Sequence, residues 1–256
     1  GKVLCLREHI DRLIESAQLL GLTDQLQAEP LCEAIELTLK KNKLDDARVR
    51  LTVTGGDLSL LAAAQAKSSG KKSKQPEHRL SVLVHATEPT PYPKSLFTKG
   101  VMTVIAAPKA NPFDPTSGHK TVNYWARRRA LNQAAAAQAS EAIWFTVTNH
   151  LCGGAVSNAM LVKDGQLLTP IARGEEPDGS IPSPTLPGVT RAALIEIAER
   201  LDIPVHRRML TINDVLEADE LMLTNSSWLV MPVIAVEKST IGAGEPGPIT
   251  KQLHGA

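Results

Sequence analysis

The sequence predicts a two-domain protein of mixed α/β (α+β) class, and three observations lead to this prediction. Helical and strand patterns alternate along most of the chain. A proline-rich segment, "EPTPYP", separates a shorter first stretch from a longer second one. The chain has 256 residues, which is enough for one large domain or two small ones and for a sizeable buried core.

We expect a small first domain over residues 1–87. Its predicted elements, in order, are a strand end leading into an amphipathic helix over 1–22, a helix near 31–44, and strands over 47–56 and 79–87. The first helix is indicated by Ile10, Leu13, Ala17 and Leu20, which are spaced along one helical face. In the first of the two strands apolar and polar side chains alternate, which is typical of a half-buried strand.

Between these strands, residues 67–79 are polar and basic without periodicity, which predicts a loop. The stretch "QAKSSGKKS" partly matches the phosphate-binding pattern GxxxxGKS. Gln65 occupies the place of the required first glycine, and no strand leads directly into the stretch. A solvated loop is therefore the favoured interpretation.

Residues 88–94 form the expected proline-rich linker, and residues 95–256 the larger second domain. Its predicted elements are a strand over 100–107, a helix over 124–140, strands over 141–148 and 158–165, a helix over 191–201, and further strands after it. The chain contains no internal repeat. Helices and strands are mixed in both domains, which supports the α/β (α+β) class.

Composition excludes several classes of function. The formal net charge is +1, so no global electric field attracts nucleic acid or an anionic membrane. The three cysteines, Cys5, Cys32 and Cys152, are few and widely spaced, which favours a reducing compartment over a disulfide scaffold. No apolar run reaches the roughly 18 residues of a membrane span, and we expect no secretory signal. We expect a cytoplasmic protein without a metal site.

Three segments of the second half have compositions typical of binding sites. In "LPGVTRAALIEIAERL" a helix opens at Val189 or Thr190, and the free N–H groups of a helix start can bind phosphate; alternatively, Thr190 is only an N-cap. The run "LTNSSW" ends an apolar strand with hydroxyl and amide side chains, or is simply a turn. The glycine pair of "CGGAVSNAMLVKDGQLLTP" indicates a tight turn packed close to another backbone.

Taken in order, these segments resemble the fold-type IV pyridoxal-phosphate enzymes, the class IV aminotransferases. The resemblance extends over nearly the whole chain and is carried by "LREHIDRLIESAQLLGL", "KTVNYWARRRALNQA", "SNAMLVKDGQLLTP", "LPGVTRAALIEIAERLDIPV", "ADELMLTNSSWLVMPV" and "GEPGPITKQL". The family includes branched-chain and D-amino acid aminotransferases and aminodeoxychorismate lyase. The resemblance implies a two-domain fold with pyridoxal 5'-phosphate at the domain interface, amino acid and keto acid substrates, and a homodimer.

The resemblance also implies roles for individual residues. Lys120 is similar to the lysine that binds the cofactor covalently, and Tyr124 to the tyrosine beside the cofactor ring. The expected phosphate ligands are Arg12, Val189, Thr190 and Ser226. Arg50 resembles a position that reaches substrate carboxylates in some members, and Ser227 is a second tentative substrate residue; for Arg50 an ordinary surface arginine remains the alternative. The three arginines 127–129 point in different directions around a helix, and we assign them no role.

Two departures from the family pattern stand out. Family members usually carry further residues before the point where this chain starts, so we expect either a trimmed sequence or a divergent member. The second departure is Gly153, which occupies the place of a glutamate that pairs with the cofactor ring nitrogen. Without that carboxylate the ring is a weaker electron sink, so we expect slow transamination. Gly153→Glu should raise the rate if the site has room for the side chain.

The function that follows is an aminotransferase of amino acid metabolism that exchanges an amino group between an amino acid and a 2-keto acid. Lys120 would hold the cofactor and then act as general base and acid at the substrate α-carbon. Three alternatives remain: an aminodeoxychorismate lyase that eliminates pyruvate, a non-catalytic family member, and a nucleic-acid-binding module. The last is disfavoured because the basic loop 67–79 lacks interleaved aromatic residues.

Overall fold

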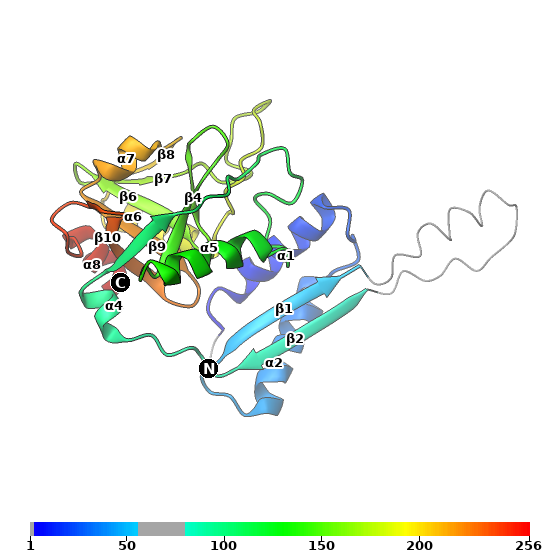
Figure 1. Cartoon of the computed structure of the whole chain (residues 1–256). Coiled ribbons are helices and arrows are strands. Elements are labelled where there is room, and N and C mark those ends of the chain that lie inside the picture. Colours follow the sequence, from blue (N-terminus) through cyan, green and yellow to red (C-terminus); the bar gives the residue numbers. More distant parts are fainter. Residues whose placement is uncertain (1–2, 56–79) are drawn as a thin grey trace, which may run out of the picture. The chain divides into compact units, whose positions relative to one another are not determined.

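The computed structural model describes residues 3–55 and 80–256 (Figure 1). The chain divides into two compact units, Gly1–Thr90 and Pro91–Ala256. This division falls inside the expected linker 88–94. The basic loop 67–79 and its partial phosphate-loop match lie outside the described residues.

The first unit is a two-stranded antiparallel sheet packed on two helices. Its elements are α1 (Leu6–Leu19), α2 (Ala28–Asn42), β1 (Arg48–Thr54) and β2 (Ser81–Thr87). Ile10, Leu31 and Ile35 form the centre of its core, against which Leu51 and Val84 of the sheet pack. Both helices and both strands predicted here are confirmed.

Within the described residues, the strand end expected before the first helix is wrong. Val3 has no regular structure, Leu4 and Cys5 form a turn, and the helix begins at Leu6. Cys5, the residue before the helix, has a left-handed conformation with φ 46°. This conformation interrupts an extended backbone, so the short apolar run leads directly into α1.

The second unit is built on one large mixed sheet. Its elements are α4 (Lys94–Thr98), β3 (Val101–Ile105), α5 (Trp125–Ala136), β4 (Glu141–Phe145), β5 (Leu151–Gly154), β6 (Asn158–Lys163), β7 (Gln166–Thr169), α6 (Val189–Arg200), β8 (Val205–Arg207), α7 (Ile212–Leu216), β9 (Glu220–Asn225), β10 (Leu229–Val236), β11 (Ser239–Thr240) and α8 (Pro248–Gly255). The strand order is β5-β4-β3-β10-β9-β6-β7-β8, with β11 paired to β10. Strand β3 is parallel to both its neighbours, β10 and β4, whereas β6 and β9 pair antiparallel.

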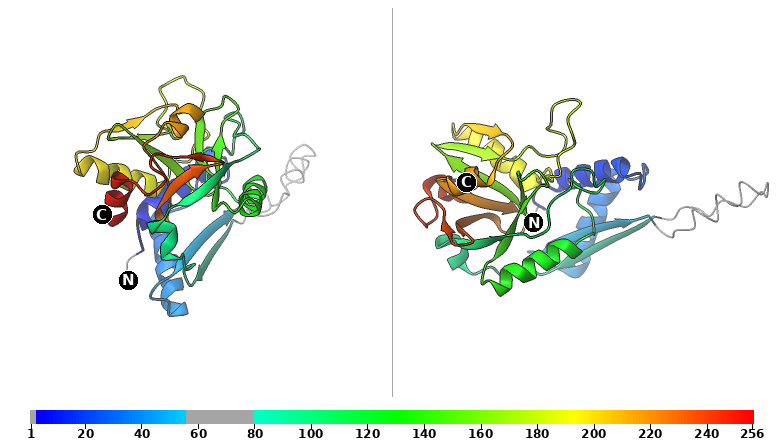
Figure 2. Two further views of the ribbon diagram at one scale, coloured as in Figure 1. Left: turned by 60° about the vertical axis from the view of Figure 1, so that its left-hand side comes forward. Right: turned by 45° about the horizontal axis from the view of Figure 1, so that its top comes forward.

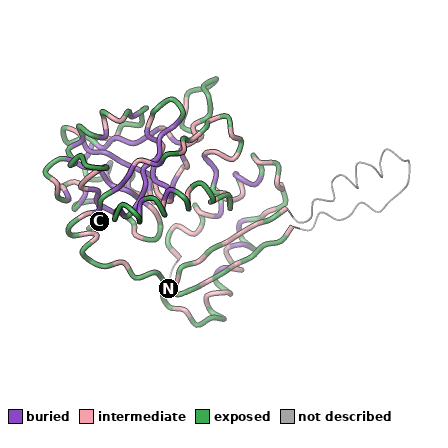
Figure 3. The backbone as a smooth tube through the Cα atoms, in the orientation of Figure 1, coloured by how far each residue is buried: buried purple, intermediate pink, exposed green. Residues whose placement is uncertain are grey.

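Both faces of the central strands are buried, so these strands are apolar on both sides. Along β6, Met160 packs in the cluster that contains Leu194 of α6 and Leu253 of α8, whereas Leu161 packs in the cluster on the opposite face. Figure 2 shows α6 (yellow) and α8 (red) together on one side of the sheet. The buried backbone of this unit is concentrated in the same strands (Figure 3).

The predicted helices 124–140 and 191–201 and the predicted strands of this unit are confirmed, and with them the mixed α/β class. Several elements were not predicted, among them the helices α7 and α8 after α6. The glycine pair belongs to strand β5 instead of a turn, and α4 begins inside the expected linker, at Lys94. Among the described residues there is no helix with the length and apolar character that crossing a membrane requires.

A buried carboxylate fixes the last helix to the sheet. Glu220, at the start of β9, accepts hydrogen bonds from the backbone N–H groups of Ile249 (3.0 Å) and Thr250 (2.7 Å) in the first turn of α8. We expect Glu220→Ala to lower the free energy of unfolding by about 1–3 kcal/mol, because two N–H groups lose a charged partner.

Urea unfolding followed by circular dichroism measures this difference. The control is Glu196→Ala on the exposed side of α6, for which we expect a change within about 0.5 kcal/mol. Equal effects of the two substitutions would contradict the capping role of Glu220.

Candidate functional site

Lys120 lies in the loop that precedes α5 and has an exposed side chain. Its Nζ donates a hydrogen bond to the Tyr124 hydroxyl. The same Nζ lies 4.9 Å from the centroid of the Tyr124 ring. The two residues that the family resemblance places beside one cofactor therefore lie in direct contact.

The loop before Lys120 is held in place by a later segment of the chain. Arg173 Nη1 donates to the Ser117 carbonyl oxygen at 2.9 Å. Gly118 has a φ of 78°, and a Cβ at this position would lie 2.8 Å from the Ser183 carbonyl oxygen. Only glycine fits this close approach without strain, so the position of Lys120 depends on the segment that contains Arg173 and Ser183.

Arg127 connects the start of α5 to the turn that follows the glycine pair. Its Nη1 donates to the Ala155 carbonyl oxygen at 2.7 Å, and its guanidinium lies 5.8 Å from the centroid of the Trp144 ring. The sequence alone assigns no role to Arg127. Three consecutive arginines look alike in the sequence, and only the packing of α5 shows which of them points inward.

Gly153 has a backbone conformation that side chains rarely adopt. Its φ is 146°, and a Cβ would lie 2.8 Å from the Ser157 carbonyl oxygen. The expectation that glutamate could be restored here therefore needs correction, because the structure offers no room for it unless the backbone shifts. The close backbone approach predicted for the glycine pair is confirmed.

A different acid, Glu141, organises the turn next to Gly153. Its side chain is buried and accepts hydrogen bonds from the N–H groups of Ala155 (3.1 Å) and Val156 (3.3 Å) and from the Ser157 hydroxyl (3.2 Å). It also accepts from the N–H of Ala142 at 2.9 Å. Burial raises the pKa of Glu141, and these donors partly offset that effect. Glu141 could not be recognised from the sequence, since a carboxylate that opens an apolar strand carries no local signal.

The start of α6 presents a candidate phosphate site. Gly188 is the N-cap, and no side chain in the described part of the chain caps this end of the helix. The alternative that Thr190 is the N-cap is therefore wrong: Val189 and Thr190 lie in the first helical turn. Asn158 fixes the approach to the helix, because its Nδ2 donates to the Leu186 carbonyl oxygen at 2.8 Å.

The segment "LTNSSW" ends strand β9 at Asn225 and forms a turn over residues 226–228, which Asn225 holds. The Asn225 side-chain oxygen accepts from the N–H groups of Ser227 (2.9 Å) and Trp228 (3.1 Å). Its Nδ2 donates to the Val156 carbonyl oxygen at 3.2 Å. The strand register places Thr224, the residue before Asn225, opposite Asn158. Ser226 and Ser227, both exposed, thus lie at the same end of the sheet as the approach to α6.

The Thr224 hydroxyl oxygen is buried at this end of the sheet. No hydrogen-bond partner for it exists among the described residues. A buried hydroxyl is normally hydrogen-bonded in a native protein, so this one is a candidate for an interaction with a bound group.

These contacts join four segments of the second unit: 117–127, 152–158, 183–190 and 224–228. They carry the predicted residues Lys120, Tyr124, Val189, Thr190, Ser226 and Ser227. Arg12 and Arg50 belong to the first unit, where Arg12 Nη2 lies 3.4 Å from His9 Nδ1 on α1 and Arg50 is exposed on β1 opposite His85. Their roles at the site remain predictions.

An unpredicted ion pair anchors the first turn of α6. Arg191 is only 2% exposed, and its two terminal nitrogens donate to the two carboxylate oxygens of Glu175, each at 2.8 Å. Arg207 adds a second cation at 3.3 Å from the same carboxylate. Burial alone would raise the pKa of Glu175, but the hydrogen bonds from Arg191 and from the Ala172 N–H outweigh burial and lower it.

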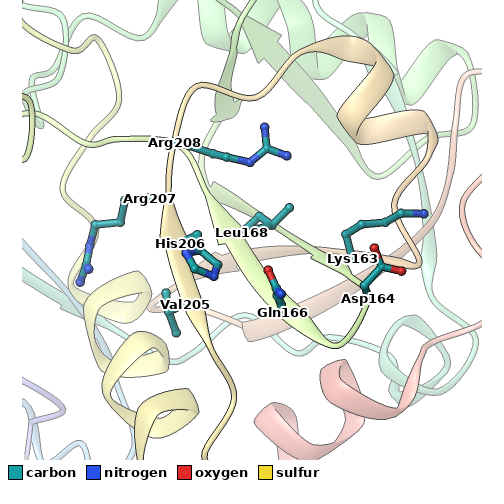
Figure 4. Close-up of a pocket in the computed structure, with 8 residues that line it drawn as sticks. All are labelled: Lys163, Asp164, Gln166, Leu168, Val205, His206, Arg207 and Arg208. Carbon is teal, nitrogen blue, oxygen red and sulfur yellow. The ribbon is translucent and has the colours of Figure 1, made fainter.

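A pocket of about 700 Å³ lies elsewhere in the second unit (Figure 4). It is lined by Lys163, Asp164, Gln166, Leu168, Val205, His206, Arg207 and Arg208, and contains none of the predicted site residues. Its cations are neutralised: Arg208 lies 2.6 Å from Asp214, and Lys163 lies 3.5 Å from Asp219. We therefore place the candidate site at the four joined segments and not in this pocket.

Comparison with known proteins finds a family model and relatives that agree with one another. The family model described as "Amino-transferase class IV" matches residues 1–236. A Methanocaldococcus jannaschii protein with a provisional branched-chain-amino-acid aminotransferase name is 30% identical over 99% of this chain and 81% of its own. The crystal structure of the Escherichia coli branched-chain amino acid aminotransferase is 27% identical over 98% of this chain and 77% of its own, with a TM-score of 0.82.

A third relative shares the fold. It is a branched-chain amino acid aminotransferase from T.th., solved with pyridoxamine 5'-phosphate. This protein is 24% identical over 98% of this chain and 76% of its own, with a TM-score of 0.80. The matches cover both units of the chain, and they confirm the resemblance that the sequence motifs indicated.

The strain at Gly153 leads to a stability prediction. We expect Gly153→Ala to lower the free energy of unfolding by roughly 1–3 kcal/mol, because of its backbone conformation and the contact with Ser157. The control is Gly165, which has a φ of 74° and no heavy atom within 4 Å of the place that a Cβ would take. Gly165→Ala carries only the conformational cost of about 1 kcal/mol. Urea unfolding should show the larger loss for Gly153→Ala; the reverse order would contradict the close contact.

The ion pair of Glu175 leads to a prediction about pH. The folded-state pKa of Glu175 lies below its ordinary value of 4.5. Ionised Glu175 therefore stabilises the fold above pH 4.5, and this contribution is lost as the pH falls through the folded-state pKa. We expect the free energy of unfolding of the wild type to fall more steeply in this acid range than that of Glu175→Gln.

Urea unfolding at a series of acid pH values measures both slopes. Glu196→Gln, which changes an exposed glutamate of α6, should keep the wild-type slope. A Glu175→Gln slope as steep as that of the wild type would rule out this contribution.

Proposed function

The chain belongs to the class IV amino-transferase family and is an aminotransferase that uses pyridoxal 5'-phosphate, and we propose that Lys120 is the residue that holds this cofactor. The contact between Lys120 and Tyr124 is the single observation that carries the proposal. It places an exposed primary amine beside an aromatic ring and a hydroxyl group, within a unit whose other predicted residues gather at one end of the sheet.

The donors in this unit fit the chemistry of the cofactor. A phosphate dianion requires N–H and hydroxyl donors, and a helix N-terminus favours its negative charge. The first turn of α6 offers such N–H groups without a side-chain cap in the described chain, and Thr224 adds a buried hydroxyl without a partner there. An aldehyde requires an accessible amine, which Lys120 provides.

When bound, pyridoxal 5'-phosphate supplies an aldehyde that reacts with amines and a ring that accepts electron density from the substrate α-carbon. Lys120 would hold the aldehyde end of the cofactor, and its amine would act as general base and acid for the proton of the substrate α-carbon. Val189, Thr190 and Ser226 bind the phosphate, together with Arg12. Tyr124 orients Lys120 through its hydroxyl group, and Arg50 and Ser227 contact the substrate.

The substrates we propose are an amino acid and a 2-keto acid. Branched-chain amino acids are the first donors to test, because the relatives above carry that name. We also propose that the enzyme is a cytoplasmic homodimer. The three cysteines are free thiols, which is consistent with a reducing compartment.

Gly153 favours a second candidate function, the elimination reaction of an aminodeoxychorismate lyase. The family pattern has a carboxylate at the position of Gly153. The nearby acid, Glu141, already accepts hydrogen bonds from Ala142, Ala155, Val156 and Ser157. A less stabilised negative charge at the α-carbon slows transamination more than an elimination whose product is strongly favoured. Comparing amino transfer with pyruvate release from aminodeoxychorismate decides between the two functions.

Trapping with borohydride tests the role of Lys120. After loading with pyridoxal 5'-phosphate and reduction, we expect peptide mapping to find the cofactor on Lys120, because only an amine joined to the aldehyde is fixed by reduction. Lys120→Arg should abolish both the label and amino transfer. The control Lys163→Arg, whose lysine donates to the Glu217 carbonyl oxygen, should keep both. Label on another lysine, or none on loaded wild-type protein, would disprove the assignment.

A further inference from the structure

Residues 169–176 connect the two parts of the candidate site, and we call this segment the brace. It begins at the last residue of β7 and contains partners of both the α6 start and the loop before Lys120. Neither the family motifs nor the proposed function assigns these residues a role.

At one end the brace is fixed to the first turn of α6 by Arg191. Besides its paired bonds to Glu175, Arg191 donates from Nε to the Thr169 hydroxyl and from Nη2 to the Pro170 carbonyl oxygen, each at 2.9 Å. The guanidinium is 2% exposed, and the planar fork fits a carboxylate in only one orientation. The first turn of α6 therefore cannot rotate or slide without breaking buried charged hydrogen bonds.

Inside the brace, Glu175 also orders the backbone. Its Oε2 accepts from the Ala172 N–H at 2.8 Å, and its own N–H donates to the Ala172 carbonyl oxygen at 3.0 Å. The residue that follows Ala172, Arg173, donates its N–H to the Thr185 carbonyl oxygen at 2.9 Å. The direction of the Arg173 side chain is thus set by the same turn that holds Arg191.

At the other end the brace is fixed to the loop of Lys120. Arg173 Nη1 donates to the Ser117 carbonyl oxygen at 2.9 Å, and a Cβ on Gly118 would lie 2.8 Å from Arg173 Cδ. Lys120 is two residues beyond Gly118. One short segment therefore contacts both the helix start that offers phosphate donors and the loop that carries the reactive amine.

We propose that the brace is a positioning device that sets the separation between Lys120 and the first turn of α6, with the Arg191–Glu175 pair fixing the phosphate end and Arg173 fixing the amine end. The proposal rests on the proposed function, because a cofactor of fixed length must reach both ends at once. Arg191, Glu175 and Arg173 act through other residues and are positioning residues, not catalytic ones.

The phosphate end is tested by comparing pyridoxal 5'-phosphate with pyridoxal, which lacks the phosphate. Binding of each to the apoprotein is followed by the visible absorption of the bound aldehyde. For Arg191→Lys, which keeps the charge but loses the fork, we expect a Kd for pyridoxal 5'-phosphate about tenfold higher, equivalent to about 1.4 kcal/mol. The Kd for pyridoxal should stay within about twofold of the wild type, a difference below about 0.5 kcal/mol.

The amine end is tested with Arg173→Met. We expect borohydride trapping on Lys120 to become slower by the same factor with both aldehydes, while the ratio of their Kd values stays at the wild-type value. The matched control is Arg208→Lys, which alters the exposed Arg208–Asp214 ion pair of the same unit and should change neither quantity. Glu175→Gln replaces Arg191→Lys if the latter does not fold, with the same expected change in the ratio.

The outcomes separate this inference from the proposed function. If the wild type forms no adduct with either aldehyde, the proposed function fails and the inference fails with it. A second outcome is that the wild type binds pyridoxal 5'-phosphate while Arg191→Lys raises the Kd values of both aldehydes equally, or raises neither. In that case the Arg191–Glu175 pair has only a structural role, and the inference alone is overturned. Unchanged trapping in Arg173→Met overturns the role at the amine end.

Discussion

The second unit depends on the buried carboxylate of Glu141. It stands at the first position of β4 and accepts four hydrogen bonds, three of them from consecutive residues of the turn after β5. A buried hydrogen-bond donor that loses its partner costs about 1–3 kcal/mol, and the Ala155 N–H, which is buried, also donates to the Ala142 carbonyl oxygen at 2.9 Å. The Glu141 side chain therefore holds the turn after β5 against strand β4. The position of this turn determines where the segments that contact it lie.

From this turn the polar contacts extend in three directions. Arg127 brings the start of α5 to Ala155, Asn225 brings the end of β9 to Val156, and Asn158 brings the approach to α6 to the start of β6. The amine of Lys120, the hydroxyl groups of the "LTNSSW" segment and the helix N-terminus belong to the elements joined in this way. A site built from such distant parts of the sequence requires a rigid common support, and a packed mixed sheet with a satisfied buried acid provides it.

The turn after β5 also determines which side chains can face the ring of the cofactor at the proposed site. Gly153 approaches Ser157 so closely that no side chain fits, and Glu141 uses its carboxylate to hold the backbone instead of facing outward. The unit therefore combines the proposed phosphate donors and a lysine–tyrosine pair with a glycine at the place of the family's ring-nitrogen acid. Under the proposed function, the residues that bind the cofactor differ from the residue that would pair with its ring nitrogen. Cofactor binding can therefore be strong while the ring accepts electron density only weakly.

The sequence by itself determined the mixed α/β class, most helices and strands, the family, and the residue types that a phosphate and an aldehyde require, because these follow from local periodicity and from motifs of adjacent residues. It could not show that Glu141, Arg191 and Arg173 support the site, since each acts on a partner far away in the sequence. It also could not show that Gly153 excludes a side chain, because that depends on the backbone of Ser157 across the turn. Which of three neighbouring arginines points inward, and whether Thr190 or Gly188 caps α6, were decided only by tertiary packing, which sets the distances on which hydrogen bonds and steric contacts depend.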